Sequence, residues 1–142
     1  MACATTQTLV AGFNMVDVGH VNLTDVCSNP GVESMFQYTP TASPADITVQ
    51  VLDGLGNAVA QYTDCTGTNM LQCNPSPSLP ITRWEGGTMF LLVNEPAFAS
   101  GVAIQVLEVP VLPTGAACDP TGQANRCDSF ACVDQGAGPV CL

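Results

Sequence analysis

Positive charge is nearly absent from this sequence. The 142 residues include no lysine, two arginines and one histidine against twelve acidic residues, so the formal net charge is −10. Proteins that bind nucleic acids or anionic membrane surfaces do so largely through clustered lysine and arginine. The composition therefore excludes DNA, RNA and acidic lipid as partners.

Long apolar runs and targeting segments are also missing. No stretch of eighteen apolar residues occurs, which predicts that the chain does not insert into a membrane. No basic segment followed by an apolar stretch opens the chain, so we expect the mature or excised part of something longer. Only 10% of residues are charged and 46% are hydrophobic, which is typical of a folded domain and not of a disordered acidic tail.

Cysteine, by contrast, is abundant. Eight cysteines in a chain of this length predict oxidised pairs, and such pairs indicate an extracellular or cell-surface protein. The alternative is a zinc protein, but structural zinc sites need closely spaced pairs of cysteine or histidine. Only Cys127 and Cys132 are close to each other, and His20 is the single histidine. The predicted disulfide cysteines are Cys3, Cys27, Cys65, Cys73, Cys118, Cys132, Cys127 and Cys141.

Apolar and polar residues alternate along most of the first 110 positions, as in β-strands with one buried face. The predicted strands cover residues 8–10, 15–23, 34–38, 47–52, 58–63, 89–94 and 102–109. Residues 89–93 are apolar on both faces, which predicts a central strand. Seven or eight short strands of this kind predict an all-β fold: an antiparallel two-sheet sandwich, jelly-roll-like, with a barrel as the lesser option.

Glycine and proline mark the expected connections. Residues 53–57 read Asp-Gly-Leu-Gly-Asn and predict a hairpin loop, and Gly86 with Gly87 predicts the turn before the apolar strand. The prolines at 75, 77 and 80 predict an exposed loop, because proline lacks the backbone donor that strand pairing requires.

The composition changes near Pro110, so the sequence predicts a β-sandwich domain over residues 1–110 and a cysteine-rich module over residues 111–142. The module is too short to bury a core of its own, and two internal disulfides are its expected scaffold. Its symmetric cysteine spacing favours the pairs Cys118–Cys132 and Cys127–Cys141, although four cysteines allow three connectivities.

The four remaining cysteines lie in the predicted sandwich. Cys65 and Cys73 bracket a short loop after a strand, and we expect them to close it with a disulfide. Cys3 and Cys27 are then left to attach the N-terminal strand region.

A cysteine-bracketed loop followed by a glycine-led apolar strand is a specific order of features. Here the bracket is Cys65 and Cys73, and residues 86–94 read Gly-Gly-Thr-Met-Phe-Leu-Leu-Val-Asn. Over roughly residues 5–109 this order resembles the bacterial pre-peptidase C-terminal domain, and the segment from Cys118 to Cys141 resembles small cysteine-rich modules found behind such domains. The resemblance implies a jelly-roll-like sandwich appended to exported enzymes or surface proteins, with a binding, targeting or solubilising role and no catalysis of its own.

Residues for catalysis are hard to find in the sequence. A serine or cysteine nucleophile needs a base, usually histidine, and His20 lies on a predicted strand where a structural role is expected. Glutamates at 33, 85, 95 and 108 could approach one another as the carboxylate pair of a glycosidase, but they lie mostly at strand ends and turns. We therefore expect no enzymatic activity.

Cofactors are not expected either, with calcium as the minor alternative. The candidate ligands are acids near predicted loops, namely Asp17, Asp25, Asp46, Asp53, Asp64 and Glu95. They do not form the dense alternating ladder of a dedicated calcium loop, which favours a role in solubility. Trp84, beside Arg83, is the one large aromatic expected to be partly exposed, and the pair is the candidate anchor for a protein or glycan partner.

These features predict a non-enzymatic structural or binding module of a bacterial secreted or surface protein. The alternative is a self-assembling subunit of an extracellular filament, coat or adhesive appendage. It is suggested by the sparse surface charge and the missing lysines, which usually discourage pairing between sheet edges.

Overall fold

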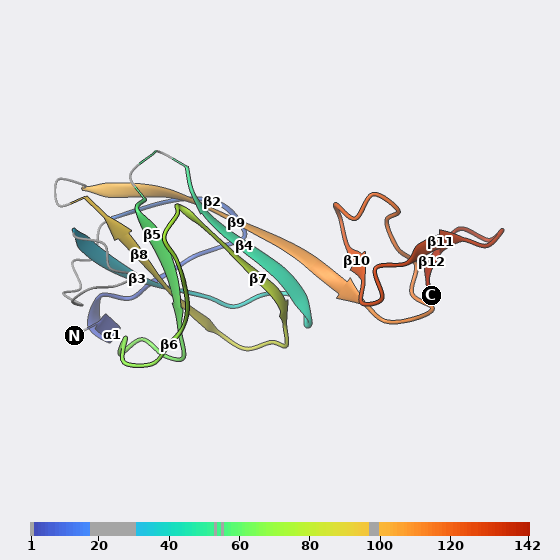
Figure 1. The fold of residues 1–142 in the computed structure, drawn as a ribbon, viewed down its shortest axis with the longest axis horizontal. Helices are drawn as coiled ribbons and strands as arrows, with labels where there is room; N and C mark the ends of the chain where they lie inside the picture. The colour runs from blue at the N-terminus through green and yellow to red at the C-terminus, as the bar shows by residue number, and fades with distance from the viewer. Residues whose placement is uncertain (1, 18–30, 53, 55, 97–99) are drawn as a thin grey trace. The chain divides into compact units, whose positions relative to one another are not determined.

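The computed structural model describes residues 2–17, 31–52, 54, 56–96 and 100–142, and its regular structure is almost entirely β (Figure 1). Within these ranges the one helix is α1 (Ala2–Thr5), and no helix there is long and apolar enough to cross a membrane. The strands are β1 (Gln7–Thr8), β2 (Gly12–Asp17), β3 (Val32–Tyr38), β4 (Ala45–Val51), β5 (Ala58–Tyr62), β6 (Met70–Asn74), β7 (Ser78–Trp84), β8 (Met89–Glu95), β9 (Gly101–Leu112), β10 (Arg126–Cys127), β11 (Cys132–Asp134) and β12 (Pro139–Cys141).

The chain divides into two compact units. One contains residues 1–39, 48–80 and 87–107, and the other contains residues 40–47, 81–86 and 108–142. We call them the N-terminal unit and the C-terminal unit. Strands β4, β7 and β9 continue from one unit into the other along the chain.

The first sheet belongs to the N-terminal unit and has the strand order β1-β3-β8-β5-β6. Strand β8 is antiparallel to both of its neighbours, β3 and β5. Met89, Leu91, Leu92 and Val93 of β8 are fully buried. A strand covered on both faces needs apolar residues at consecutive positions, so the predicted central strand is confirmed.

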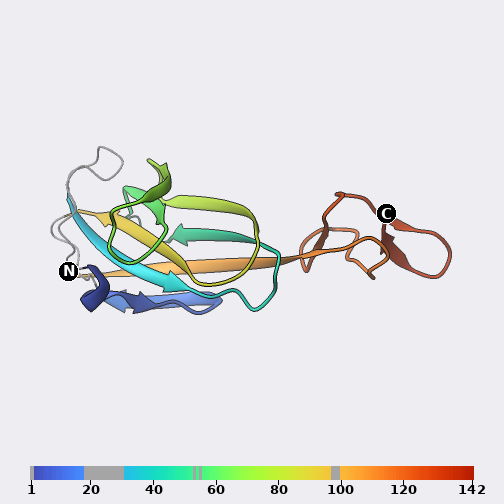
Figure 2. The same cartoon turned by 90° about the horizontal axis from the view of Figure 1, so that it is seen from below.

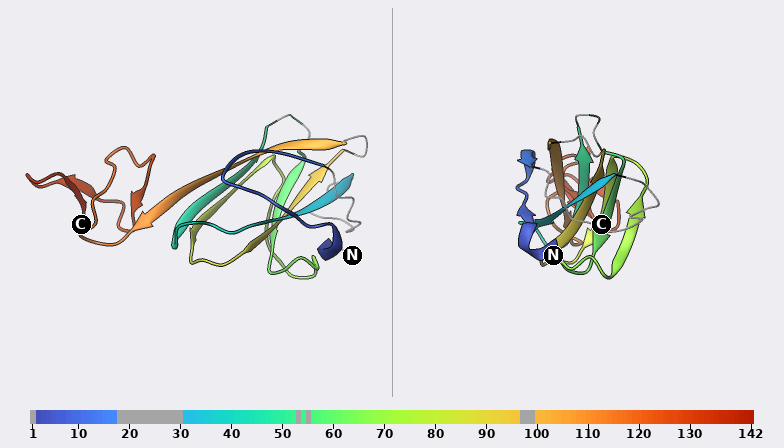
Figure 3. Two further views of the ribbon diagram at one scale, coloured as in Figure 1. Left: turned by 180° about the vertical axis from the view of Figure 1, so that it is seen from behind. Right: turned by 90° about the vertical axis from the view of Figure 1, so that its left-hand side faces the viewer.

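The second sheet has the order β10-β9-β4-β7, with β2 pairing with β9 as well. In β9 the side chains of Val102, Ile104 and Val106 are buried, and Gln105 between them is partly exposed. This alternation is the signature of a strand with one face toward a core. With the first sheet it gives the predicted all-β two-sheet sandwich, which Figures 2 and 3 show from further sides.

The predicted loop over the prolines is wrong in part. β6 ends at Asn74, directly before Pro75, and β7 begins at Ser78 and contains Pro80, so only residues 75–77 form a connection. β7 is the last strand of its sheet. An edge strand tolerates proline because the missing N–H belongs on the side that has no partner.

The predicted hairpin over residues 53–57 is also wrong. β4 lies in the second sheet and β5 in the first, so this segment carries the chain from one sheet to the other. Two alternating strands joined by a glycine-rich segment have the same sequence pattern whether they pair in a hairpin or belong to different sheets. Asp53 and Leu55 themselves lie outside the described residues. The turn between β7 and β8 is confirmed, with Gly86 at φ 114° and Gly87 at φ 81°.

The disulfides agree with the prediction in the C-terminal unit and differ from it in the N-terminal unit. Cys118 is bonded to Cys132 and Cys127 to Cys141, as the symmetric spacing favoured. Cys65 is not bonded to Cys73. Instead it pairs with Cys3, across a sequence separation of 62.

The strand register explains the difference. Cys73 lies inside β6, opposite Ala60, whereas Cys65 follows the end of β5. The ladder between β5 and β6 therefore keeps the two residues apart, and a disulfide needs Cα atoms within about 7 Å. The Cα atoms of Cys3 and Cys65 are 4.8 Å apart. Cys73 is disulfide-bonded too, and Cys27 lies outside the described residues.

Short strands and the two disulfides organise the end of the chain. β10 runs parallel to β9, with Arg126 opposite Val111, and β11 pairs with β12 in an antiparallel ribbon. A division into separate domains at residue 110 stays a prediction. The compact C-terminal unit also includes residues 40–47 and 81–86, which come from β4, from β7 and from the segments beside them.

Candidate functional site

The two arginines of the chain come together with three acids in the C-terminal unit. Asp46 is on β4, Arg83 on β7 and Arg126 on β10, and the remaining acids, Glu85 and Asp128, follow β7 and β10. Glu108, on β9, is a further acid of this unit. Its carboxylate accepts hydrogen bonds from the backbone N–H groups of residues 41 and 42 at 2.9 and 3.0 Å.

Arg126 forms a two-pronged ion pair with Asp46. Its Nη2 donates to Asp46 Oδ1 at 2.9 Å, and its Nε donates to Oδ2. The arginine side chain is 11% exposed and the aspartate side chain 29%. The hydrogen bonds from Arg126 lower the pKa of Asp46, which burial alone would raise, and a backbone hydrogen bond from Arg83 adds to the effect. Both members therefore stay ionised near neutral pH.

Arg83 is held by carboxylates in the same way. Its Nε donates to Asp128 Oδ1 at 2.9 Å and its Nη2 to Oδ2 at 3.2 Å, and its Nη1 forms an ion pair with Glu85. The hydrogen bonds from Arg83 lower the pKa of Asp128. Because both arginines are paired with acids of the same unit, the surface that this unit offers to a partner is predominantly negative.

Backbone strain concentrates in this unit. Among the described residues, the two non-glycine positions with positive φ are Arg83 at 51° and Phe130 at 61°. Residues other than glycine rarely adopt this backbone conformation, and it persists only where surrounding contacts hold it. Arg83 N–H donates to Asp46 Oδ1 at 2.8 Å, and Phe130 N–H donates to the carbonyl of Cys127 at 2.9 Å.

Phe130 is the most exposed of the large apolar side chains in the described part of the chain, at 76%. The guanidinium of Arg126 lies 4.3 Å from the centre of its ring, within the range of a cation–π contact. The ring borders a pocket of about 190 Å³ that is also lined by Asp119, Thr121 and Cys132. The Phe130 ring therefore contacts the Arg126 guanidinium on one face, and most of the rest of the ring is exposed to solvent.

A further pocket, of about 240 Å³, lies in the same unit. Arg83 and Asp128 line it together with Pro44, Val111 and Pro113. Sites for drug-sized molecules commonly reach 300–1,000 Å³. Both pockets are therefore closer in size to a single side chain of a partner than to a whole small molecule.

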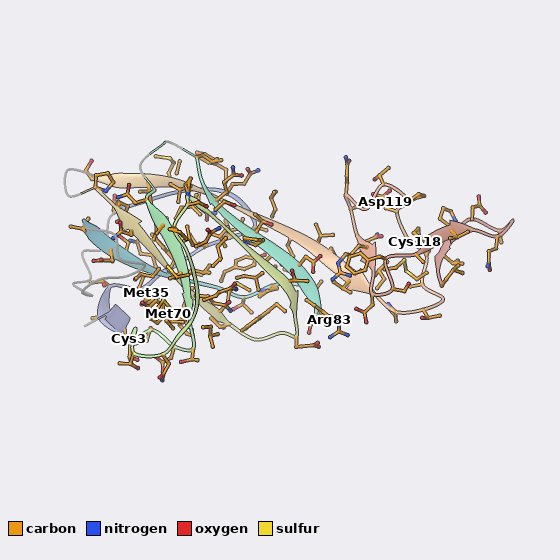
Figure 4. All side chains as sticks on the ribbon, in the orientation of Figure 1. Cys3, Met35, Met70, Arg83, Cys118 and Asp119 are labelled. Atoms are coloured by element: carbon orange, nitrogen blue, oxygen red, sulfur yellow. A yellow bond between two sulfur atoms is a disulfide. The ribbon has the colours of Figure 1, made fainter. Side chains whose placement is uncertain are left out.

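Asp119 organises the loop beside the first pocket. Its carboxylate accepts backbone N–H groups from Ala124 at 2.9 Å, Thr121 at 2.9 Å and Gln123 at 3.2 Å, and Figure 4 labels it together with Cys118 and Arg83. The bond from Ala124 first, then that from the Thr121 hydroxyl at 2.7 Å and the other backbone bonds, lower the pKa of Asp119 to about 2. The carboxylate is engaged in shaping the loop.

One group of candidate metal ligands gathers in the described part of the chain. The sulfur atoms of Cys118, Cys127 and Cys132 lie within 4.8 Å of one another, but all three are in disulfides and carry no thiolate that could bind zinc.

The acids that suggested calcium are dispersed. Asp17 ends β2, Asp64 accepts hydrogen bonds from Thr66, Glu95 is buried at the end of β8, and Asp46 is paired with Arg126. Asp25 and Asp53 lie outside the described residues.

The acids considered for glycoside chemistry divide between the two units. Glu33 and Glu95 are buried at the ends of the neighbouring strands β3 and β8 in the N-terminal unit, and Asn94 Nδ2 donates to Glu33 Oε1 at 3.2 Å. Glu85 and Glu108 belong to the C-terminal unit. His20 lies outside the described residues.

The predicted anchor, Trp84 with Arg83, lies on β7 and not in a loop. Trp84 is half-buried, and Arg83 lines the larger pocket with its charge already paired. Its binding role stays a prediction. Sequence reasoning missed Phe130, although a lone aromatic in an otherwise polar, cysteine-rich segment was an available signal.

Comparisons with known proteins give a similarity of backbone only. No protein-family model matches the chain, and no curated protein matches it in sequence. The pre-peptidase C-terminal domain of collagenase from Bacillus anthracis is 10% identical with a TM-score of 0.43, covering 71% of this chain and 93% of that chain. PliG from Aeromonas hydrophila, a periplasmic inhibitor of g-type lysozyme, is 12% identical with a TM-score of 0.41, covering 72% and 96%. Membership of the pre-peptidase C-terminal family stays a prediction.

Proposed function

We propose that this protein is a non-catalytic module that works outside the cytoplasm and binds another protein through the C-terminal unit. The observation that carries the proposal is Phe130, an aromatic side chain that is 76% exposed, held at positive φ and stacked on Arg126 beside a pocket. Interface energy is usually concentrated in a few aromatic and arginine residues next to pockets. An exposed ring fixed before binding loses little conformational entropy when a partner covers it.

The disulfides support a place outside the cytoplasm. Three pairs are described, Cys3–Cys65, Cys118–Cys132 and Cys127–Cys141, and the reducing cytosol does not normally maintain such pairs. Two of them stabilise the unit that presents Phe130. A rigid, oxidised scaffold with an exposed aromatic residue suits recognition in the periplasm, in the medium or at a cell surface.

Pocket size and charge favour a protein partner with a neutral or basic surface. The pocket beside Phe130 is about 190 Å³, enough for one inserted side chain. The C-terminal unit carries six acids against two arginines, and both arginines are paired internally. Like charges across an interface are costly, so an acidic partner is disfavoured.

The experiment compares the wild-type chain with Phe130→Ala on an array of extracellular proteins and on a glycan array. Leu71→Ala is the matched control, because it removes an exposed apolar side chain from the N-terminal unit. We expect a protein ligand whose affinity falls about 30-fold in Phe130→Ala, the loss for an aromatic hot spot worth about 2 kcal/mol, and is retained in the control.

Two results would contradict the proposal. One is a protein ligand bound equally well by the wild type and Phe130→Ala. The other is binding to glycans alone with loss on Trp84→Ala, which would favour the anchor predicted from the sequence.

A further inference from the structure

Strand β2 forms an edge of the second sheet in the N-terminal unit. Among the described residues it pairs with β9 on one side only, over the whole length from Gly12 opposite Val106 to Asp17 opposite Gly101. Two apolar side chains of this strand are strongly exposed, Phe13 at 60% and Met15 at 69%. An open sheet edge with apolar side chains is a ready template for another strand.

The hydrogen bonds of β9 show which backbone groups of β2 are open. The carbonyl of Ala103 accepts the N–H of Leu52, which directly follows β4, so Ala103 directs its backbone toward β4. Backbone groups point to opposite sides at successive positions, so Ile104 directs its own toward β2, where it faces Asn14.

The backbone groups of the two residues beside Asn14 therefore point in the opposite direction. The N–H and C=O groups of Phe13 and Met15 point away from β9, toward the open side. The carbonyl of Asp17, which has the same orientation, accepts the side-chain amide of Gln7 at 2.6 Å on that side. No backbone hydrogen bond to Phe13 or Met15 from outside β2 and β9 occurs in the described part of the chain.

The other described sheet edges carry features that discourage pairing. β1 and β10 are only two residues long, and β11 and β12 only three. β6 is next to a register irregularity at Gln61 and Tyr62 and contains the disulfide-bonded Cys73, and β7 contains Pro80. Short length, bulges and prolines are the usual means by which proteins protect sheet edges. In the described ranges, β2 has none of the three.

We propose that two copies of this chain associate through β2, which pairs antiparallel with itself. Pairing centred on Asn14 places Phe13 of one copy opposite Met15 of the other, and each such pair exchanges two backbone hydrogen bonds. The apolar side chains of both copies then share the solvent face of one continuous sheet. In this register Asp17 lies beyond the first residue of the partner's β2, next to Ala11, so no two acids are opposed despite the net charge of −10.

This pairing uses the same surface on both copies, so it closes after two copies and does not propagate into a filament. It is independent of the protein-binding role proposed for Phe130, which lies in the C-terminal unit. The sequence suggested self-association in general, and β2 identifies one surface and one stoichiometry.

The test is sedimentation equilibrium of the full chain and three variants from roughly 10 µM to 1 mM, the range expected for a small interface. We expect the wild-type mass to rise from 14.6 kDa toward twice that value and no further. Met15→Pro removes an N–H that faces the open side, so it should leave the pairing with β9 intact and weaken association at least tenfold. Phe13→Lys should do the same, and it covers the case in which Met15→Pro does not fold.

Leu71→Lys is the matched control, since Leu71 is 53% exposed on the edge strand β6. Each lysine makes the chain less negative, so a general charge effect would strengthen association in both lysine variants. We expect Leu71→Lys to dimerise like the wild type. A wild type that stays monomeric, a mass above the dimer, or dissociation by Leu71→Lys alone would overturn the proposal.

Amide hydrogen exchange gives a readout specific to the pairing. The amides of Phe13 and Met15 should become protected as the concentration rises, whereas that of Asn14, already bonded to β9, should not change. Exchange at Phe13 and Met15 that is independent of concentration would also overturn the proposal.

Discussion

Replacing Asp46 with asparagine should destabilise the C-terminal unit by about 2 kcal/mol at neutral pH. Breaking a fully buried ion pair by removing one member costs about 3–5 kcal/mol, and an exposed pair contributes about 0–1 kcal/mol. The pair of Asp46 with Arg126 lies between these limits, with side chains 29% and 11% exposed. Asparagine keeps the size of the side chain but removes the carboxylate that is hydrogen-bonded to the guanidinium, which leaves only the weaker attraction of Asp128.

Urea denaturation, monitored by tryptophan fluorescence, measures this loss of stability in the C-terminal unit itself. Trp84 is the single tryptophan of the chain and lies on β7, within residues 81–86 of the C-terminal unit. With an m-value of about 2 kcal/mol/M, a loss of about 2 kcal/mol lowers the urea midpoint by about 1 M. Asp17→Asn, at the exposed end of β2, is the matched control and should move the midpoint by less than about 0.3 M.

The pH dependence of the loss separates the ion pair from a packing effect. Because Arg126 lowers the pKa of Asp46 below its ordinary value of 3.8, the stabilisation is complete above pH 3.8 and disappears as the pH falls through the folded-state pKa. The gap between the wild type and Asp46→Asn should therefore close in acid. A loss below about 0.5 kcal/mol at pH 7, or one of equal size at pH 7 and pH 2, would refute this reasoning.

Two further measurements test the C-terminal unit. The backbone amide of Ala124 donates to Asp119, so its NMR resonance should titrate with a midpoint near pH 2. The loop should keep its hydrogen bonds above pH 3.8 and lose them below pH 2. A midpoint near 3.8 would contradict a loop held by the Asp119 carboxylate. Changing Cys127 and Cys141 together to serine should lower the free energy of unfolding by about 3 kcal/mol, the value for a loop closed across their sequence separation of 14. A loss under about 1 kcal/mol in urea denaturation would show that this disulfide does not restrict the conformations of the unfolded chain.

The alternation of apolar and polar residues was sufficient to predict the sheets, because a half-buried strand requires it. Val102, Ile104 and Val106 are buried in β9 for this reason, and the doubly apolar run from Met89 to Val93 was correctly predicted as central. The alternation did not predict which strands pair. It therefore predicts a hairpin over residues 53–57, although this segment joins two sheets.

Disulfide pairing was also predictable only where the bonded cysteines are close in the sequence. In the C-terminal unit the cysteines are close in sequence, so their symmetric spacing was enough to favour the observed pairs. In the N-terminal unit Cys65 pairs with Cys3, a partner distant in sequence, because the ladder of β5 and β6 separates it from Cys73. Nearness along the chain is a poor guide once a strand register intervenes.

The candidate site was the least predictable part. Its residues come from β4, β7, β10 and the turn after β10, and only folding places Asp46 beside Arg126. The scarcity of cations was evident from composition, but their internal pairing was not. That pairing changes the prediction for Arg83, whose charge is already balanced by Asp128 and Glu85.

The sequence by itself determined the all-β class and the oxidised cysteines, because each depends on composition or on a local repeat; the exclusion of polyanionic partners stays a prediction. Tertiary structure alone decided which acids neutralise the two arginines, that Phe130 is the most exposed aromatic side chain of the described residues, and that β2 is paired on one side only within the described ranges. These features depend on contacts between residues far apart in the chain, and their geometry is set by strand order and register, which a local pattern of side chains does not encode.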